Sequence, residues 1–96
     1  MTTLGIDLET YSEAPIKDCG SFRYIEDPSF EILLFAYSID GAPAVVVDFT
    51  AEERLPHEVL DAIWDPDVVK TGWNNAFERF AIQKHFERYC PPEQWE

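Results

Sequence analysis

Two carboxylates, Asp7 and Glu9, stand two residues apart near the start of the 96-residue sequence. They alternate with Leu4, Ile6 and Leu8, and this period of two is typical of a strand. In a strand, the acids emerge on one face while the apolar side chains point to the other. Like charges this close repel unless a cation or hydrogen-bond donors compensate them. Oxygen ligands of this kind suit Mg²⁺ or Mn²⁺, although a solvated polar face on an edge strand explains the same spacing.

A third candidate carboxylate, Glu78, lies where a predicted strand ends and a predicted helix begins. An acid in the first turn of a helix is stabilised by the helix macrodipole, which gives Glu78 a purely structural role. The carboxyl end of a strand is also where α/β sheets usually bind their ligands. Position alone therefore leaves both roles open for Glu78.

The hydrophobic pattern predicts an α/β fold built on a mixed sheet. Strand-like patterns cover residues 4–9, 30–39, 44–49 and 68–73. The first three strands form a meander, in which Asp40-Gly41-Ala42-Pro43 makes the turn between the second and the third. A helical crossover then lays the fourth strand parallel to an earlier one.

Helices are expected at two places. The first opens at Leu55-Pro56-His57-Glu58, where a proline and an acid favour a helix start, and it stops at Asp65-Pro66. The second runs from about Ala76 to about Arg88, with Asn74 as its cap. These helices are expected to cover at least one face of the sheet.

Two segments are expected to lack extended regular structure. Residues 10–29 contain two prolines and a glycine among mixed charges, so we expect at most one helical turn, around residues 16–19. Residues 90–96 are expected to reach no further strand. The sequence therefore predicts a single partial domain over residues 1–96, with an unpaired sheet edge through which copies could self-associate.

The charge balance excludes one class of nucleic-acid-binding protein. Seven Lys and Arg against 19 Asp and Glu give a net charge of −12, so no broad basic surface neutralises phosphates, and contact with a polyanion requires metal ions or another chain. Cys19 and Cys90 are too few for a disulfide scaffold and indicate a reducing, cytoplasmic setting. The apolar runs are too short to cross a bilayer, so no membrane partner is expected.

Together, the two acidic segments resemble the first two motifs of DEDD-type 3′-5′ exonucleases. Ile6-Asp7-Leu8-Glu9-Thr10 matches the Asp-x-Glu-Thr motif, and Asn74-x-x-Phe77-Glu78 matches a motif that usually ends in Asp. The stretch between residues 11 and 37, including Cys19-Gly20-Ser21-Phe22-Arg23-Tyr24, is similar to the amino-terminal proofreading domain of phage-type family A DNA polymerases. The resemblance covers essentially all 96 residues and is more specific than either motif alone.

This resemblance implies a ribonuclease H-like fold and a two-metal hydrolysis of the 3′-terminal phosphodiester of DNA, with Mg²⁺ or Mn²⁺ as cofactor. Asp7 is then expected to bridge both ions. Glu9 is expected on the side of the attacking water, and Glu78 is expected to help hold the second ion. Bound cations, rather than Lys and Arg, would carry the contact to phosphate.

Three further residues, Thr10, Asn74 and Phe77, are implied as contacts to the terminal nucleotide. Each also has a structural alternative. Thr10 suits a strand end, Asn74 suits a helix cap, and Phe77 with Phe80 suits the core better than a base-stacking platform. His57 and His85 have no partners at ligand spacing and are expected on a solvated helix face.

Two departures limit the match to the family. Glu78 stands where the family usually has Asp, and the third motif, which supplies the fourth carboxylate and positions the attacking water, is missing. We therefore expect a fragment with weak or no catalysis, whose partners are a DNA 3′ end and the remainder of a polymerase chain in a bacterial or phage-infected cell. The alternative is a non-catalytic acidic binding module or DNA mimic. Stabilisation by metal distinguishes the two.

Overall fold

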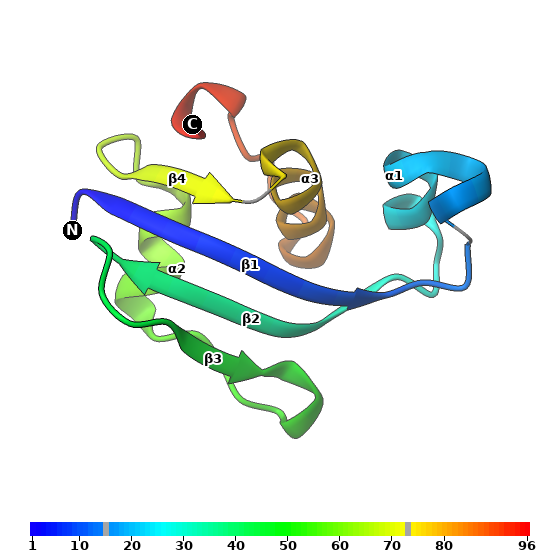
Figure 1. The fold of residues 1–96 in the computed structure, drawn as a ribbon, viewed down its shortest axis with the longest axis horizontal. Helices are drawn as coiled ribbons and strands as arrows, with labels where there is room; N and C mark the ends of the chain where they lie inside the picture. The colour runs from blue at the N-terminus through cyan, green and yellow to red at the C-terminus, as the bar shows by residue number, and fades with distance from the viewer. Residues whose placement is uncertain (15, 73) are drawn as a thin grey trace.

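A computed structural model describes residues 1–14, 16–72 and 74–96, with the side chains of residues 16–19 and 21 left aside. Within these residues, four strands form one mixed sheet in the order β3-β2-β1-β4 (Figure 1). The strands are β1 (Thr3–Tyr11), β2 (Glu31–Ile39), β3 (Val45–Asp48) and β4 (Val69–Gly72). The helices are α1 (Ile16–Glu26), α2 (His57–Trp64) and α3 (Asn75–Phe86). The predicted α/β class is confirmed and is compatible with part of a ribonuclease H-like fold.

Strand β1 occupies an interior position in the sheet. It pairs antiparallel with β2 from Leu4↔Ile39 to Tyr11↔Glu31, and parallel with β4 from Thr3↔Val69 to Ile6↔Gly72. The predicted meander and parallel crossover are therefore confirmed. Residues Thr3–Ile6 of β1 have a neighbour on both sides, whereas Asp7 and Glu9 pair with β2 alone and are exposed, so the solvated face of an edge strand stays open as an explanation for the acidic pair.

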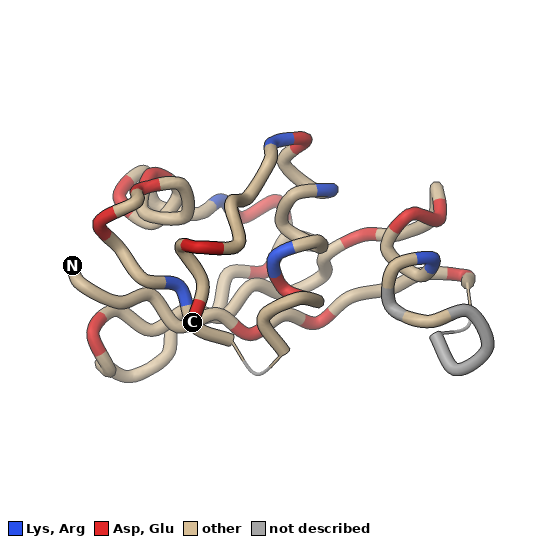
Figure 2. The backbone as a smooth tube through the Cα atoms, turned by 90° about the horizontal axis from the view of Figure 1, so that it is seen from above, with Lys and Arg blue, Asp and Glu red and all other residues tan. Residues whose placement is uncertain are grey.

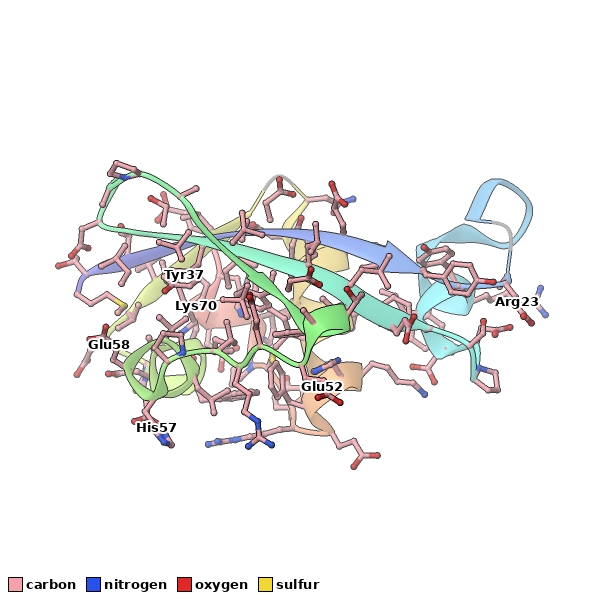
Figure 3. All side chains as sticks on the ribbon, turned by 90° about the horizontal axis from the view of Figure 1, so that it is seen from below. Arg23, Tyr37, Glu52, His57, Glu58 and Lys70 are labelled. Carbon is pink, nitrogen blue, oxygen red and sulfur yellow. The ribbon has the colours of Figure 1, made fainter. Side chains whose placement is uncertain are left out.

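Helices α2 and α3 lie on one face of the sheet, as the view from below shows (Figure 3). Apolar side chains from both helices and from the strands pack between these layers, because burying them removes their surface from water. The main core consists of Leu4, Ile6, Phe35, Tyr37, Val47, Val59, Ala62, Ile63, Val68, Ile82 and Cys90. Alternation along β1 then turns Asp7 and Glu9 toward the other face, where both are exposed.

Helix α1 corrects the prediction of at most one turn at residues 16–19. It spans Ile16–Glu26 with a kink at Gly20, whose φ of 78° lies in the left-handed region that glycine adopts readily. Contacts with α3 stabilise it: the Phe22 ring meets the Phe80 ring edge-on at 6.1 Å, and Ile25 is 1% exposed. Figure 1 shows α1 beyond the end of the sheet, next to the arrowhead of β1.

The carboxyl-terminal residues make one contact with the sheet that the sequence did not predict. Trp95 forms a parallel bridge with Lys70 of β4, and the Glu96 N–H donates to the Lys70 carbonyl at 2.9 Å. Among the described residues no strand follows β4, as predicted, but this isolated bridge joins the segment to the sheet. The outer edge of β4 is partly covered by these two residues.

Two element ends lie earlier than predicted. Strand β3 stops at Asp48 because this side chain accepts the Thr50 N–H at 2.9 Å and caps a short 3₁₀ turn over Phe49–Ala51. Helix α3 stops at Phe86 because Glu87 takes a left-handed φ of 51°. Among the described residues, no helix combines the length and the apolar character that crossing a bilayer requires.

Asp40 ties the start of β1 to the turn after β2. Its Oδ1 accepts the N–H groups of Thr3 at 2.8 Å and Thr2 at 2.7 Å, and these bonds lower the pKa of Asp40 from its ordinary value of 3.8. A carboxylate with a lowered pKa stabilises the fold above its unfolded pKa, and this stability is lost as the pH falls through the folded pKa.

Asp40→Asn is therefore expected to lower the melting temperature at neutral pH and to leave it unchanged below the folded pKa of Asp40. Circular dichroism melts over this pH range measure the difference. Asp61→Asn, at an exposed position of α2, is the matched control and should show no drop at either pH. A drop for Asp40→Asn that persists in acid would contradict an effect of charge.

Candidate functional site

The acidic pair lies just past the point where β4 ends. The last residue pair between β1 and β4 is Ile6↔Gly72, and Asp7 follows it directly. Asp7 and Glu9 are both exposed, whereas Leu4 and Ile6 are buried. The prediction that the two acids share one face of a strand is therefore confirmed.

Glu78 sits in the first turn of α3 in a pair of reciprocal hydrogen bonds. Asn74 caps the helix, since its side chain accepts the Phe77 N–H at 3.4 Å. The backbone N–H of Glu78 donates to the Asn74 carbonyl oxygen at 3.1 Å, and Oε2 of Glu78 accepts the backbone N–H of Asn74 at 3.0 Å. The predicted cap is confirmed, and Glu78 is only 4% exposed.

Gly72 provides the space that the Glu78 carboxylate occupies. A Cβ at position 72 would lie 2.9 Å from Oε2 of Glu78 and 3.3 Å from Oδ1 of Asn75, so a side chain there would displace them. This Oδ1 is buried and finds no hydrogen-bond partner in the described part of the chain. The sequence analysis missed Gly72 and Asn75, although a glycine at the end of an apolar strand indicates a close approach.

The electrostatics of Glu78 connect it to the acidic pair. Burial raises the pKa of Glu78 above its ordinary value, the backbone N–H groups of Glu78 and Asn74 lower it, and the charge of Asp7 raises it further. Asp7 and Glu78 therefore interact as like charges. In the described residues, however, no group of three or more Asp, Glu, His or Cys side chains lies close enough to hold a metal ion. The predicted cluster of three carboxylates is thus not assembled.

The donor groups nonetheless suit a hard divalent cation in kind. The Glu78 carboxylate and the unpartnered Oδ1 of Asn75 both lie against Gly72, and Asp7 follows Ile6, the residue that pairs with Gly72. All of these donors are oxygens, which Mg²⁺ and Mn²⁺ prefer. Asp7 and Glu78 are therefore candidate ligands, with Glu9 next along the strand.

The remaining predicted residues lie around the end of β1. Oγ1 of Thr10 is 3.1 Å from the hydroxyl of Tyr24, a residue of α1 that the sequence analysis did not select. Phe77 and Phe80 are partly buried and pack on a second apolar cluster, in line with the core role weighed for them. Thr10 and Phe77 thus both lie near α1.

The two histidines are exposed, as the sequence predicted. His57 lies on the surface of α2 (Figure 3). The ring of His85 also stacks on Phe49, with 5.0 Å between the ring centroids. Figure 2 shows acidic residues spaced along the whole backbone and few basic ones, in agreement with the strongly negative net charge.

Comparison with known proteins finds a relative for nearly the whole chain. Over 95 residues, or 99% of the chain, the sequence is 46% identical to a protein of Bacillus phage SP02 named DNA polymerase. This chain is related to part of a phage DNA polymerase. It spans 15% of the length of that polymerase. No family model matches the chain, and no solved structure matches it.

Proposed function

We propose that this polymerase-related chain is part of a metal-dependent 3′-5′ exonuclease domain, which removes misinserted nucleotides from a DNA 3′ end. The observation that carries the proposal is geometric: the Glu78 carboxylate lies against Gly72, the β4 residue that pairs with Ile6, and Asp7 follows Ile6 directly. Two acids far apart in sequence thus flank the carboxyl end of β4, one just past the β1–β4 pairing and the other in the first turn of α3. This is the usual place for a ligand in an α/β sheet.

The carboxylates have separate roles in this proposal. Asp7, Glu9 and Glu78 would hold Mg²⁺ or Mn²⁺. When two such ions are bound, they lower the pKa of the attacking water and neutralise the leaving oxygen of the phosphodiester. Thr10 and Asn74 would orient the terminal nucleotide, and Phe77 would support that end of the sheet from the core.

The isolated chain is proposed to cleave DNA weakly or not at all. Its three acids do not form an assembled metal cluster within the described residues. Its net charge of −12 repels DNA, so steering of the substrate would fall to the rest of the polymerase. The unassembled carboxylates and the negative net charge are independent reasons to expect weak cleavage by the isolated chain.

Mn²⁺ is expected to raise the melting temperature of the wild-type chain, because a ligand that binds only the folded state stabilises it by about 2.7 kcal/mol at 100 times its Kd. Asp7→Asn and Glu9→Gln are expected to lose most of this shift in a thermal-shift titration. Glu58→Gln is the matched control, since Glu58 is an exposed acid on α2 (Figure 3). Its shift should equal that of the wild type.

Two outcomes would contradict these expectations. Equal Mn²⁺ shifts in Asp7→Asn and wild type would favour the non-catalytic acidic binding module instead. Rapid cleavage of single-stranded DNA by the isolated chain, abolished by Asp7→Ala, would show that the chain is active without a further carboxylate.

A further inference from the structure

Tyr24 on α1 contacts both segments that carry the candidate carboxylates. Its hydroxyl lies 3.1 Å from Oγ1 of Thr10, the residue after Glu9. Its ring lies 6.1 Å from the ring of Phe77, the residue before Glu78. One side chain therefore links the end of β1 to the first turn of α3.

The pairing of β1 with β2 is irregular at the point that Tyr24 contacts. Glu9 pairs with Leu34 but Thr10 pairs with Ile32, so the register between β1 and β2 shifts between these two residues. The extra residue, Leu33, belongs to β2. A bulge of this kind bends the strand that carries it and increases the local twist, which re-aims the side chains beside it on both strands. The bond from Tyr24 reaches the first residue past the shift, and it therefore fixes the direction in which the strand leaves Glu9.

Aromatic contacts hold the Tyr24 ring in place. The ring of Phe30 meets it edge-on at 5.8 Å, and the ring of Phe77 is tilted against it by 40°. Elsewhere on α1, Phe22 packs edge-on against Phe80 of α3. Because α1 is attached to α3 in this way, a displacement of Tyr24 would move Thr10 relative to the start of α3.

We propose that Tyr24 is a positioning residue that sets the separation of Glu9 from Glu78, and with it the affinity of this end of the sheet for Mg²⁺ or Mn²⁺. This inference rests on the proposed function. The hydrogen bond orients the strand that carries Glu9, and the ring contact orients the helix turn that carries Glu78. Partners that orient metal ligands typically change metal affinity by about 10- to 100-fold when they are replaced.

The test is the Kd for Mn²⁺, measured from the electron paramagnetic resonance signal of free Mn²⁺ at a temperature where every variant is folded. Tyr24→Leu removes the ring and the hydroxyl, and it is expected to weaken binding about tenfold. Tyr24→Phe keeps the ring contacts and is expected to retain most of the affinity. Thr10→Val should match Tyr24→Phe, and the double variant should bind no more weakly than either, because both changes remove the same bond.

Phe22→Leu is the matched control. Phe22 lies on the same helix and its ring contacts Phe80, but it is 62% exposed, and in the described part of the chain it makes no ring contact or hydrogen bond with Thr10 or Phe77. Its replacement should lower the melting temperature without changing the Kd for Mn²⁺. A role of Tyr24 in folding alone would give this same pattern for Tyr24→Leu.

The outcomes separate this inference from the proposed function. Wild-type affinity in Tyr24→Leu, together with lost affinity in Asp7→Asn, would overturn the role of Tyr24 and leave the metal site standing. Absence of Mn²⁺ binding in the wild type would overturn both. A tenfold loss in Tyr24→Leu with an unchanged Phe22→Leu supports the positioning role.

Discussion

Lys70→Ala is expected to lower the free energy of unfolding by about 3 kcal/mol or more, and the melting temperature by more than about 10 °C. The Lys70 side chain is 0% exposed and lies between the sheet and the helices (Figure 3). Its Nζ donates to the carbonyl oxygens of Asp65 and Val68, both at 2.8 Å, and to Oε1 of Gln94 at 3.0 Å. The substitution removes these three bonds and leaves a cavity in the core.

Two further variants separate the causes of this loss. Lys84→Ala changes an exposed lysine of α3 and is expected to shift stability by less than about 0.5 kcal/mol. Lys70→Met keeps most of the aliphatic volume and removes the ammonium group, so the difference between Met and Ala reports the cavity. Similar chemical-denaturation curves for Lys70→Ala and Lys84→Ala would contradict a structural role for the buried amine.

The pH dependence gives a second signature of the Lys70 amine. Burial lowers the pKa of Lys70 from 10.5, while the charge of Asp65 partly raises it. Between the folded pKa and 10.5, the unfolded chain binds more protons, so wild-type stability gains a rising contribution with pH in that window. Lys70→Met should lack this contribution.

Glu78→Gln is expected to stabilise the metal-free protein at neutral pH and to abolish its stabilisation by Mn²⁺. Burial raises the pKa of Glu78, and the Asp7 charge adds to this effect. A carboxylate with a raised pKa loses stability as the pH rises through the folded pKa. Glutamine avoids this loss, can still accept the Asn74 N–H, and brings an amide donor to the region of the unpartnered Asn75 Oδ1.

Thermal melts with and without Mn²⁺ measure both effects. The gain of Glu78→Gln over wild type should grow from about pH 4 upward, since both proteins are uncharged at this position in acid. Glu58→Gln, at the exposed position on α2, should show neither the gain nor the loss of the Mn²⁺ shift. A Gln variant less stable than wild type at neutral pH would mean that the hydrogen bond from Asn74 outweighs the cost of burying the charge.

Local sequence patterns determine some parts of the fold. The alternation around Asp7 and Glu9 predicted the strand and the face of each acid, because burial of Leu4 and Ile6 leaves one register. Asn74 predicted the start of α3, because its side chain satisfies a free N–H of the first turn. Both signals depend on neighbours within a few residues.

Helix α1 and Tyr24 depend on contacts distant in sequence. Pro15 and Gly20 favour a loop locally, and Gly20 does interrupt the helical backbone with its positive φ. The contacts of Phe22 with Phe80 and of Tyr24 with Phe77 join α1 to a helix about 50 residues later. The hydrophobic pattern within residues 10–29 does not indicate these contacts with α3.

The burial of Glu78 and Lys70 could likewise not be predicted from the sequence. Glu78 matched a motif and a helix start, yet its burial depends on the missing Cβ of Gly72 in another element. A lysine within a strand is ordinarily expected in contact with solvent. The Lys70 ammonium group is instead buried, and carbonyl oxygens of the preceding turn accept its hydrogen bonds inside the protein. Tertiary hydrogen bonding decides such positions.

Strand β1 pairs with both β2 and β4 from Thr3 to Ile6. Over its remaining described residues it pairs with β2 alone. Amide hydrogens past Ile6 are therefore expected to exchange with deuterium sooner than those before it. Two of the candidate carboxylates, Asp7 and Glu9, lie on this less protected half of β1. A cation that binds there would reduce the motion of this half of β1. The entropy lost in that ordering reduces the net affinity for the cation below what the cation–carboxylate contacts alone would give.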